Sequence, residues 1–235
     1  MANDKGKQAA GQAAARLVAD GQTVGLGTGT TAAFFVAALG ARVRSEGLRV
    51  RGVATSRASE ELARQGGIPL VPLGADTRPD VTIDGADEIG PELCLIKGGG
   101  GALVREKIVA RSSKRMVVIA DESKAVKQFG FFPLPVAVLP FGADGTLVAL
   151  RTLALPGATT QSAAFRRASD GSRYITDDGL YIVDMHFGGI TAPPVHVEAA
   201  LRALPGVVDC GLFVGIADLA LVGSDDGTVR ELRRP

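Results

Sequence analysis

The chain has 235 residues, of which 46% are hydrophobic and 22% charged, and its net charge is +1. This length suits one large domain or two modest ones with a buried core, and the near-neutral charge argues against nucleic acid or a membrane surface as the main partner. No apolar run approaches the ~18 residues of a membrane span, and the N-terminus lacks a secretory pattern. Cys94 and Cys210 have neither metal-ligand nor CxxC spacing, so we expect buried thiols in a reduced, cytoplasmic protein.

The first 125 residues alternate between helix-like and strand-like patterns. Helices are predicted over about 3–20, 31–45, 56–65 and 102–113, and strands over 23–27, 50–54, 68–73, 81–84, 93–97 and 115–121. Strands that alternate with helices of this length predict a parallel sheet covered by helices on both faces.

The pattern changes at the proline-rich segment FGFFPLPVAVLP. After it we predict helices over 144–155 and 194–204, with strands near 163–168, 172–176 and 180–187. These elements indicate a compact α+β unit over 131–205. The tail gives three short strands and a DDG turn, so we expect two domains, 1–130 plus 206–235 and 131–205.

The segment VGLGTGTTAAFF (24–35) reads as a strand, a glycine turn and the start of a helix. The N–H groups and the dipole at such a junction favour an anion, commonly phosphate. The segment also fits GxGxxA, a loose dinucleotide fingerprint, but the next strand ends in VATS, without the acidic residue that would bind ribose hydroxyls. The hydroxyls of Thr28, Thr30 and Thr31 suit the phosphate of a small monoester better. Alternatively, Thr30 or Thr31 only caps the helix.

The segment DGADEIGPELCLIKGGGGALVREK brings acids, a lysine and four glycines into 24 residues. Asp84 and Asp87 follow a predicted strand, at the end where open α/β sheets bind ligands; alternatively, Asp87 and Glu88 are solvated charges that begin a turn. Lys97 closes the next strand. Gly98 to Gly101 let the chain fold tightly around a bound group and offer its N–H groups.

Glu106 is the candidate general base. A helical projection at ~100° per residue places it on an apolar face, among Ala102, Leu103, Val109 and Ala110. A carboxylate there loses hydration, so we expect its pKa to rise toward a value useful for proton abstraction. The alternative is an ordinary helix glutamate paired with a lysine.

We expect the phosphate turn, the two aspartates, Lys97, the glycines and Glu106 to meet at the carboxyl edge of one sheet. Proton abstraction beside a carbonyl needs a carboxylate base, a cation or donor at the developing enediolate oxygen and a fixed phosphate handle. The sequence supplies a candidate for each of these groups.

The segments GLGTGTTAAFF, DGADEI, LIKGGGGALVREKIVA and VIADESKAVKQFGFFPLPVAV resemble the type A family of ribose-5-phosphate isomerases, and TDDGLYIVD and LPGVVDCGLF extend the resemblance over nearly the whole chain. The resemblance implies interconversion of ribose 5-phosphate and ribulose 5-phosphate in the pentose phosphate pathway, without metal or organic cofactor. It also implies a Rossmann-like domain, a smaller ferredoxin-like α+β domain, and a homodimer or dimer of dimers.

The resemblance also implies roles for single residues. Glu106 matches the base that moves the proton, Asp84 and Asp87 match an acidic pair at the sugar hydroxyls that assists ring opening and oxygen protonation, and Lys97 matches the lysine beside the enediolate oxygen. The implied substrate contacts are Lys7, Thr28, Gly29, Thr30, Thr31, Asp84, Gly85, Ala86, Asp87, Lys97, Gly98, Gly99, Gly100 and Lys124.

The chain departs from the family pattern at three places. Thr30 stands where serine is usual, Asp178 makes TDDG of the commoner TDNG, and QSAAFRRASDGSRYIT matches loosely. Two other functions remain in view. A sugar-phosphate-sensing domain of a regulator would carry a helix-turn-helix or a basic face, and a nicotinamide-dependent oxidoreductase would bind the dinucleotide.

Overall fold

The computed structural model describes residues 4–155 and 157–234, which fold into two compact units. The first unit contains the chain up to Ala86, Arg105–Ala125 and the chain from Gly215 on. The second contains Asp87–Val104 and Val126–Val214. The chain therefore passes between the units more than once, and each unit builds its own core.

The first unit is built on a six-stranded sheet in the order β13-β12-β6-β3-β1-β2. Strands β2, β1, β3, β6 and β12 run parallel, and β13 pairs antiparallel with β12. This is the doubly wound order 2-1-3-4-5 with an added edge strand, which confirms the predicted Rossmann-like class. The strands are β1 Thr23–Leu26, β2 Arg51–Ala54, β3 Val81–Gly85, β6 Met116–Asp121, β12 Leu219–Gly223 and β13 Val229–Arg233.

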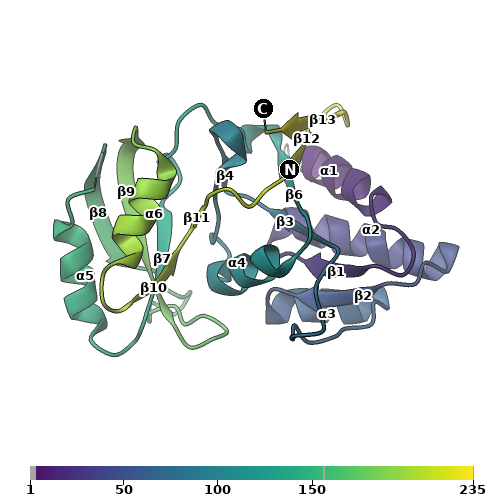
Figure 1. Cartoon of the computed structure of the whole chain (residues 1–235), viewed down its shortest axis with the longest axis horizontal. Helices are drawn as coiled ribbons and strands as arrows, with labels where there is room; N and C mark the ends of the chain where they lie inside the picture. Colours follow the sequence, from purple (N-terminus) through teal and green to yellow (C-terminus); the bar gives the residue numbers. More distant parts are fainter. Residues whose placement is uncertain (1–3, 156, 235) are drawn as a thin grey trace. The chain divides into compact units, whose positions relative to one another are not determined.

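Helices flank this sheet (Figure 1). The packing pairs α1 with α2, β6 and β12, and α2 with α3. Phe35 and Leu39 of α2 are fully buried against Leu26 and Ile83 of the sheet, so one apolar helix face closes the core. The helices are α1 Asp4–Arg16, α2 Thr30–Glu46, α3 Arg57–Gly66 and α4 Leu103–Ser112, with the short 3₁₀ helix η2 at Glu122–Lys124.

Two elements of this unit are shorter in the structure than the sequence predicted. The helix expected over 3–20, whose first position lies outside the described residues, ends at Arg16. At this end Arg42 Nη1 donates to the carbonyls of Ala15 (2.6 Å) and Val18 (2.9 Å), which supplies partners that the helix no longer provides. The strand expected over 68–73 is a single bridge between Leu70 and Gly52. The prolines in IPLVPL remove the N–H donors that a longer ladder needs.

The second unit carries a four-stranded antiparallel sheet in the order β10-β7-β9-β8. Its chain order is βαββαβ, so the strands lie as 4-1-3-2, the ferredoxin-like arrangement expected from the resemblance. Helix α5 packs on β8 and α6 on β10. The elements are β7 Leu134–Val138, α5 Ala143–Thr152, β8 Ala158–Phe165, β9 Tyr181–Ile190, α6 Pro194–Arg202 and β10 Val207–Cys210. The strand expected over 172–176 forms only isolated bridges.

A small three-stranded sheet, β11-β5-β4, completes the second unit. Its elements are β4 Glu88–Ile89, the 3₁₀ turn η1 Pro91–Leu93, β5 Leu95–Ile96 and β11 Leu212–Phe213. The segment expected to add a strand over 93–97 to the parallel sheet thus pairs antiparallel with its neighbours instead. The tail also has four strands rather than three, and its first two, β10 and β11, stay in the second unit. The unit boundaries therefore differ from those expected, since residues 87–104, 126–130 and 206–214 belong to the second unit.

Candidate active site

The first part of the site lies where the parallel sheet reverses its winding, between β1 and β3. Doubly wound sheets bind ligands beyond the carboxyl ends of the strands at this point. Here the Gly27 N–H donates to the Ile83 carbonyl (2.9 Å) and the Thr28 N–H to Asp84 Oδ1 (3.0 Å). Asp84 is fully buried. The structure therefore brings the glycine turn and Asp84 together.

The turn feeds directly into α2, and its N-cap is Gly29, at φ 102°, with no side-chain cap. The alternative in which Thr30 or Thr31 caps the helix is therefore wrong. Thr30 is exposed and Thr31 nearly buried, both in the first turn of a 17-residue helix. Such a terminus presents N–H groups and a positive dipole end, which favours an anion.

The hydroxyl of Thr28 belongs to a cluster that the sequence did not predict. It donates to Ser56 Oγ (2.8 Å) and lies 2.7 Å from Thr55 Oγ1 and 3.1 Å from Ser59 Oγ. Thr55 and Ser59 in turn donate to the carbonyls of β1 and of Gly27. Because a hydroxyl offers one proton, this hydroxyl is committed to holding the turn. The cluster also occupies the end of β2, where a dinucleotide site would place its acid.

Glu106 lies in the first turn of α4 and is only 3% exposed. Leu103, Val109 and Ala110 are buried as well, which confirms the apolar face that the projection gave to Glu106. Glu106 is therefore not a solvent-exposed helix glutamate. Lys107 is equally buried, although the projection turned it aside, so two ionisable side chains of this helix have lost most of their hydration.

The second unit holds Asp87, Lys97 and the glycine loop. Asp87 Oδ2 accepts the Gly99 N–H at 2.8 Å. Lys97 is 2% exposed, with Nζ 5.5 Å from the centre of the Phe213 ring, a distance that suits a cation–π contact. Gly98 and Gly101 adopt φ of 105° and 85°, which L-residues rarely adopt, so the loop needs glycine at both positions.

Glu88, beside Asp87, is 3% exposed and is not the solvated charge of the alternative interpretation. Its carboxylate accepts the N–H groups of Gly130 (3.0 Å) and Phe132 (2.6 Å). Glu88 thus fixes the segment that leads into β7.

One part of the expected arrangement is wrong, because β5, which precedes Lys97, pairs with β4 and β11 in the small antiparallel sheet and not in the parallel sheet. The first unit carries the glycine turn, Asp84 and Glu106, and the second carries Asp87, Lys97 and Gly98 to Gly100. The four remaining candidates are also in the first unit. Lys7 lies on α1, 3.8 Å from the carboxylate of Asp4, and Lys124 ends η2. Gly85 and Ala86 follow Asp84 at the end of β3.

Two side chains that contact the glycine loop were not among the residues predicted from the sequence. Arg166 donates to the carbonyls of Gly98 and Gly99, and the Tyr174 hydroxyl lies 3.4 Å from the carbonyl of Gly100. Both come from the loosely matched segment, which has arginines at 166, 167 and 173 and no motif that separates them. The pairing of β8 with β9 is what distinguishes Arg166 as the arginine that contacts the glycine loop.

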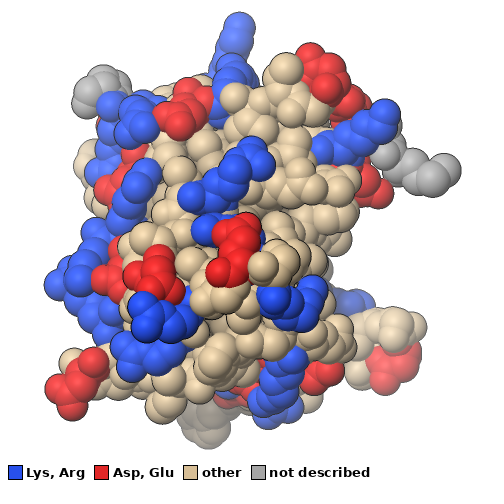
Figure 2. Space-filling model, turned by 90° about the vertical axis from the view of Figure 1, so that its right-hand side faces the viewer, with Lys and Arg blue, Asp and Glu red and all other residues tan. Residues whose placement is uncertain are grey.

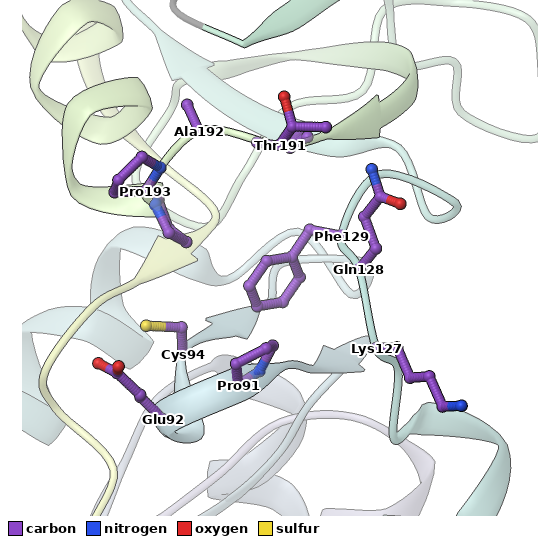
Figure 3. A pocket seen from close by; sticks show the side chains of 11 residues that line it. Pro91, Glu92, Cys94, Lys127, Gln128, Phe129, Thr191, Ala192 and Pro193 are labelled. Atoms are coloured by element: carbon purple, nitrogen blue, oxygen red, sulfur yellow. The ribbon is translucent and has the colours of Figure 1, made fainter.

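A pocket of about 570 Å³ in the second unit lies apart from these residues (Figure 3). Phe129 and Cys94 face it, with Lys127 and Gln128 beside it, and it contains none of the predicted site residues. Within residues 4–155 and 157–234, no group of three or more histidine, cysteine, aspartate or glutamate side chains is placed to hold a metal ion. No helix in the described part of the chain is long and apolar enough to cross a membrane.

Comparison with known proteins identifies the family. The model of the family described as ribose 5-phosphate isomerase A (phosphoriboisomerase A) matches residues 51–227. The chain belongs to this family. Ribose-5-phosphate isomerase A of Rhodopseudomonas palustris is 47% identical over 235 residues, which cover the whole of both chains.

Solved structures of ribose 5-phosphate isomerases share the fold. The isomerase of Plasmodium falciparum superposes with a TM-score of 0.91 at 37% identity, covering 99% of each chain. A D-ribose-5-phosphate isomerase solved in complex with phospho-erythronic acid gives 0.89 at 35% identity, covering 97% of each chain. The expected family, and with it an isomerase fold of two units, is confirmed.

Proposed function

We propose that this chain interconverts D-ribose 5-phosphate and D-ribulose 5-phosphate through an enediolate. The observation that carries the proposal is the Glu106 carboxylate, 3% exposed on the apolar face of α4, in a member of the ribose 5-phosphate isomerase A family. A carboxylate stripped of water is a stronger base toward a C–H proton than a solvated one. The relative solved in complex with phospho-erythronic acid supports a phosphorylated sugar as the ligand of this chain.

In the proposed reaction, Glu106 removes the proton from C2 of the open-chain aldose. The C–H electron pair forms the C1=C2 bond, and the carbonyl pair moves onto O1. Glu106 then returns the proton to C1 while the O2 hydroxyl proton passes to O1, which leaves the ketone at C2. Bonds and charges balance without an external oxidant, and one group serves as base and then as acid.

The other candidates bind and polarise the sugar. Lys97, desolvated in its own unit, supplies the positive charge beside the enediolate oxygen. Asp84 and Asp87 contact the sugar hydroxyls and assist ring opening and oxygen protonation. The phosphate contacts fall to the first turn of α2, with Gly29, Thr30 and Thr31, and to Lys7 and Lys124. Gly85, Ala86 and Gly98 to Gly100 complete the proposed binding set, together with Thr28, which belongs to it by shaping the turn through its hydroxyl and N–H.

Glu106→Gln tests the assignment of the base. The amide keeps the shape of the side chain but cannot accept the proton, so kcat should fall by at least about 10³-fold, measured by the conversion of ribose 5-phosphate. Glu61→Gln, on the exposed face of α3, is the matched control and should keep wild-type turnover. Near-normal turnover of the Glu106→Gln enzyme would show that another group is the base.

Two other functions predict different results. A sensor would bind the sugar phosphate without exchanging its C2 hydrogen for solvent deuterium, whereas the isomerase incorporates deuterium at C1 or C2. An oxidoreductase would bind NADH or NADPH at micromolar levels. The hydroxyl cluster at the end of β2, where that cofactor requires an acid, speaks against it.

We further propose that the enzyme works in the cytoplasm as a homodimer or dimer of dimers, without metal or organic cofactor and without nucleic acid or membrane as partner. The buried thiols Cys94 and Cys210 suit a reducing compartment. Exposed apolar side chains in the second unit, among them Phe131 and Phe141, are candidates for subunit contact. Sedimentation equilibrium would give the mass, and turnover unchanged by a chelator would support the absence of a metal.

A further inference from the structure

Arg166, directly after β8, holds two successive carbonyls of the glycine loop. Its Nη1 donates to the Gly98 oxygen at 2.8 Å and to the Gly99 oxygen at 3.0 Å. Both contacts are charge-assisted hydrogen bonds, which are stronger than neutral ones. A single guanidinium nitrogen thus fixes the orientation of two adjacent peptide groups.

Asp184 on β9 fixes the guanidinium itself. Arg166 Nε donates to Asp184 Oδ2 at 2.9 Å and Nη2 to Oδ1 at 2.6 Å, a bidentate pair in which the side chains are 15% and 22% exposed. The paired β8 and β9 strands place Ala164 opposite Asp184, two positions before Arg166. Because the planar fork fits the carboxylate at two points, Arg166 has little freedom to swing away from the loop.

The peptide geometry carries this constraint to Asp87. In a trans peptide the C=O and N–H point to opposite sides, and the described residues contain no cis peptide. The Gly98 carbonyl shares its peptide with the Gly99 N–H, which donates to Asp87 Oδ2 at 2.8 Å. The Gly99 carbonyl likewise shares its peptide with the Gly100 N–H, which therefore points away from Arg166.

The result is a continuous series of hydrogen bonds from Asp184 through Arg166 and the Gly98–Gly99 peptide to Asp87. A cation at the oxygen end and a carboxylate at the N–H end polarise this peptide in the same direction and strengthen both bonds. Glycine is required for the approach, because a Cβ at position 99 would lie 2.6 Å from Asp87 Oδ1.

We propose that Arg166, oriented by Asp184, is a positioning residue for the isomerisation. It holds the glycine loop so that the Gly99 N–H fixes the carboxylate of Asp87 and the Gly100 N–H faces away from the guanidinium, available to the sugar. The inference rests on the proposed function, in which Asp87 and the loop act on the substrate.

Variants of Arg166 distinguish a role in positioning the catalytic groups from a role in folding alone. Arg166→Ala should lower kcat by about 10- to 100-fold, since a small misplacement of catalytic groups costs that much, while KM changes less. Arg166→Lys, which keeps the charge but has no fork, should recover part of the loss. Arg167→Ala is the matched control. Arg167 is exposed and its Nη1 donates to the Gly171 carbonyl in its own turn, so turnover should not change.

Asp184 gives a second and independent variant. Asp184→Asn should lower kcat in the same direction, and the double variant with Arg166→Ala should be no slower than Arg166→Ala alone, because both changes break one series of bonds. Additive losses would overturn the proposal. So would an Arg166→Ala enzyme that melts earlier but turns over normally once folded.

Hydrogen exchange of the Gly99 amide supplies a readout that needs no turnover. Arg166→Ala should speed this exchange relative to both wild type and Arg167→Ala, and unchanged exchange would contradict the proposal. If the wild type itself failed to convert ribose 5-phosphate, the proposed function would fail, whereas the exchange result would still decide whether Arg166 orders the loop.

Discussion

Gly27, at the end of β1, is packed against the candidate catalytic carboxylate. A Cβ at this position would lie 2.5 Å from the Asp84 Cα and would collide with the Asp84 side chain as well. The Gly27 N–H also bonds to the Ile83 carbonyl, which keeps the turn close to β3. Glycine is therefore required here by the close approach of the two strands' ends, a reason that the fingerprint GxGxxA does not reveal.

Gly27→Ala should consequently damage both stability and catalysis. Overpacking at a rigid backbone position costs about 1–3 kcal/mol, and a displaced Asp84 should lower kcat by roughly tenfold or more. Thermal unfolding and steady-state kinetics measure the two effects. Gly74→Ala, where an added Cβ meets nothing within 4 Å, is the control and should leave both unchanged.

At the scale of elements, Asp80 joins three strands of the parallel sheet at their amino ends. It directly precedes β3, its Oδ2 accepts the N–H of Thr23 at the start of β1 (2.9 Å), and its Oδ1 accepts Lys114 Nζ, just before β6 (2.7 Å). The hydrogen bond from Lys114, and then that from the Thr23 N–H, lower the pKa of Asp80 below its ordinary value.

This shift predicts how stability depends on pH. A depressed folded-state pKa means that Asp80 stabilises the fold above its unfolded pKa of about 3.9 and that the gain is lost as the pH falls through the lower folded value. Asp80→Asn should therefore cost about 1 kcal/mol at pH 7, a fall in Tm of roughly 2–4 °C. In urea unfolding the difference from wild type should shrink below pH ~4. If the difference in the free energy of unfolding stayed constant down to pH 3, the ionised Asp80 carboxylate would not be its cause. The control is Asp76→Asn, which replaces an exposed aspartate of the preceding loop and should leave the free energy of unfolding unchanged.

Sequence patterns predicted the elements that depend on contacts between residues close together in the chain. The alternation of helices and strands gave the parallel sheet, and the helical projection gave the burial of Glu106, because a side chain's face follows from the helix period alone. Partners distant in sequence were not predictable. The pairing of Leu95–Ile96 with β11, the commitment of Thr28 to hydroxyls from β2 and α3, and the contact of Arg166 with the glycine loop each depend on tertiary pairing.

At the scale of the whole molecule, charge is distributed rather than concentrated. Figure 2 shows lysines and arginines interspersed with aspartates and glutamates over the face it presents, as the net charge of +1 suggests. Because positive and negative side chains alternate on this face, their fields largely cancel at long range, and a polyanion would be steered toward it only weakly. Recognition of a sugar phosphate by a few placed groups needs no such field.

Two fragments that differ in whether they contain β10 test which boundaries define the second unit. The boundaries expected from the sequence, 131–205, omit β10, which pairs with β7 through Val207–Val138 and Cys210–Val136. Without β10, the buried strand β7 becomes an open edge, and α6 loses the strand on which it packs. Open apolar edges pair with other chains, so this fragment should aggregate or stay molten.

The fragment 126–214 keeps the four strands of the βαββαβ sheet and both helices, so it should fold. It lacks Cys94 and Ile96 of its core and the Glu88 bonds to Gly130 and Phe132, and should therefore be less stable than the same unit in the whole chain. Dispersed amide resonances and a cooperative melt are expected for 126–214, against collapsed spectra and dye binding for 131–205. Equal behaviour of the two fragments would mean that β10 contributes little, and that the core of β7, β8, β9 and the two helices is sufficient.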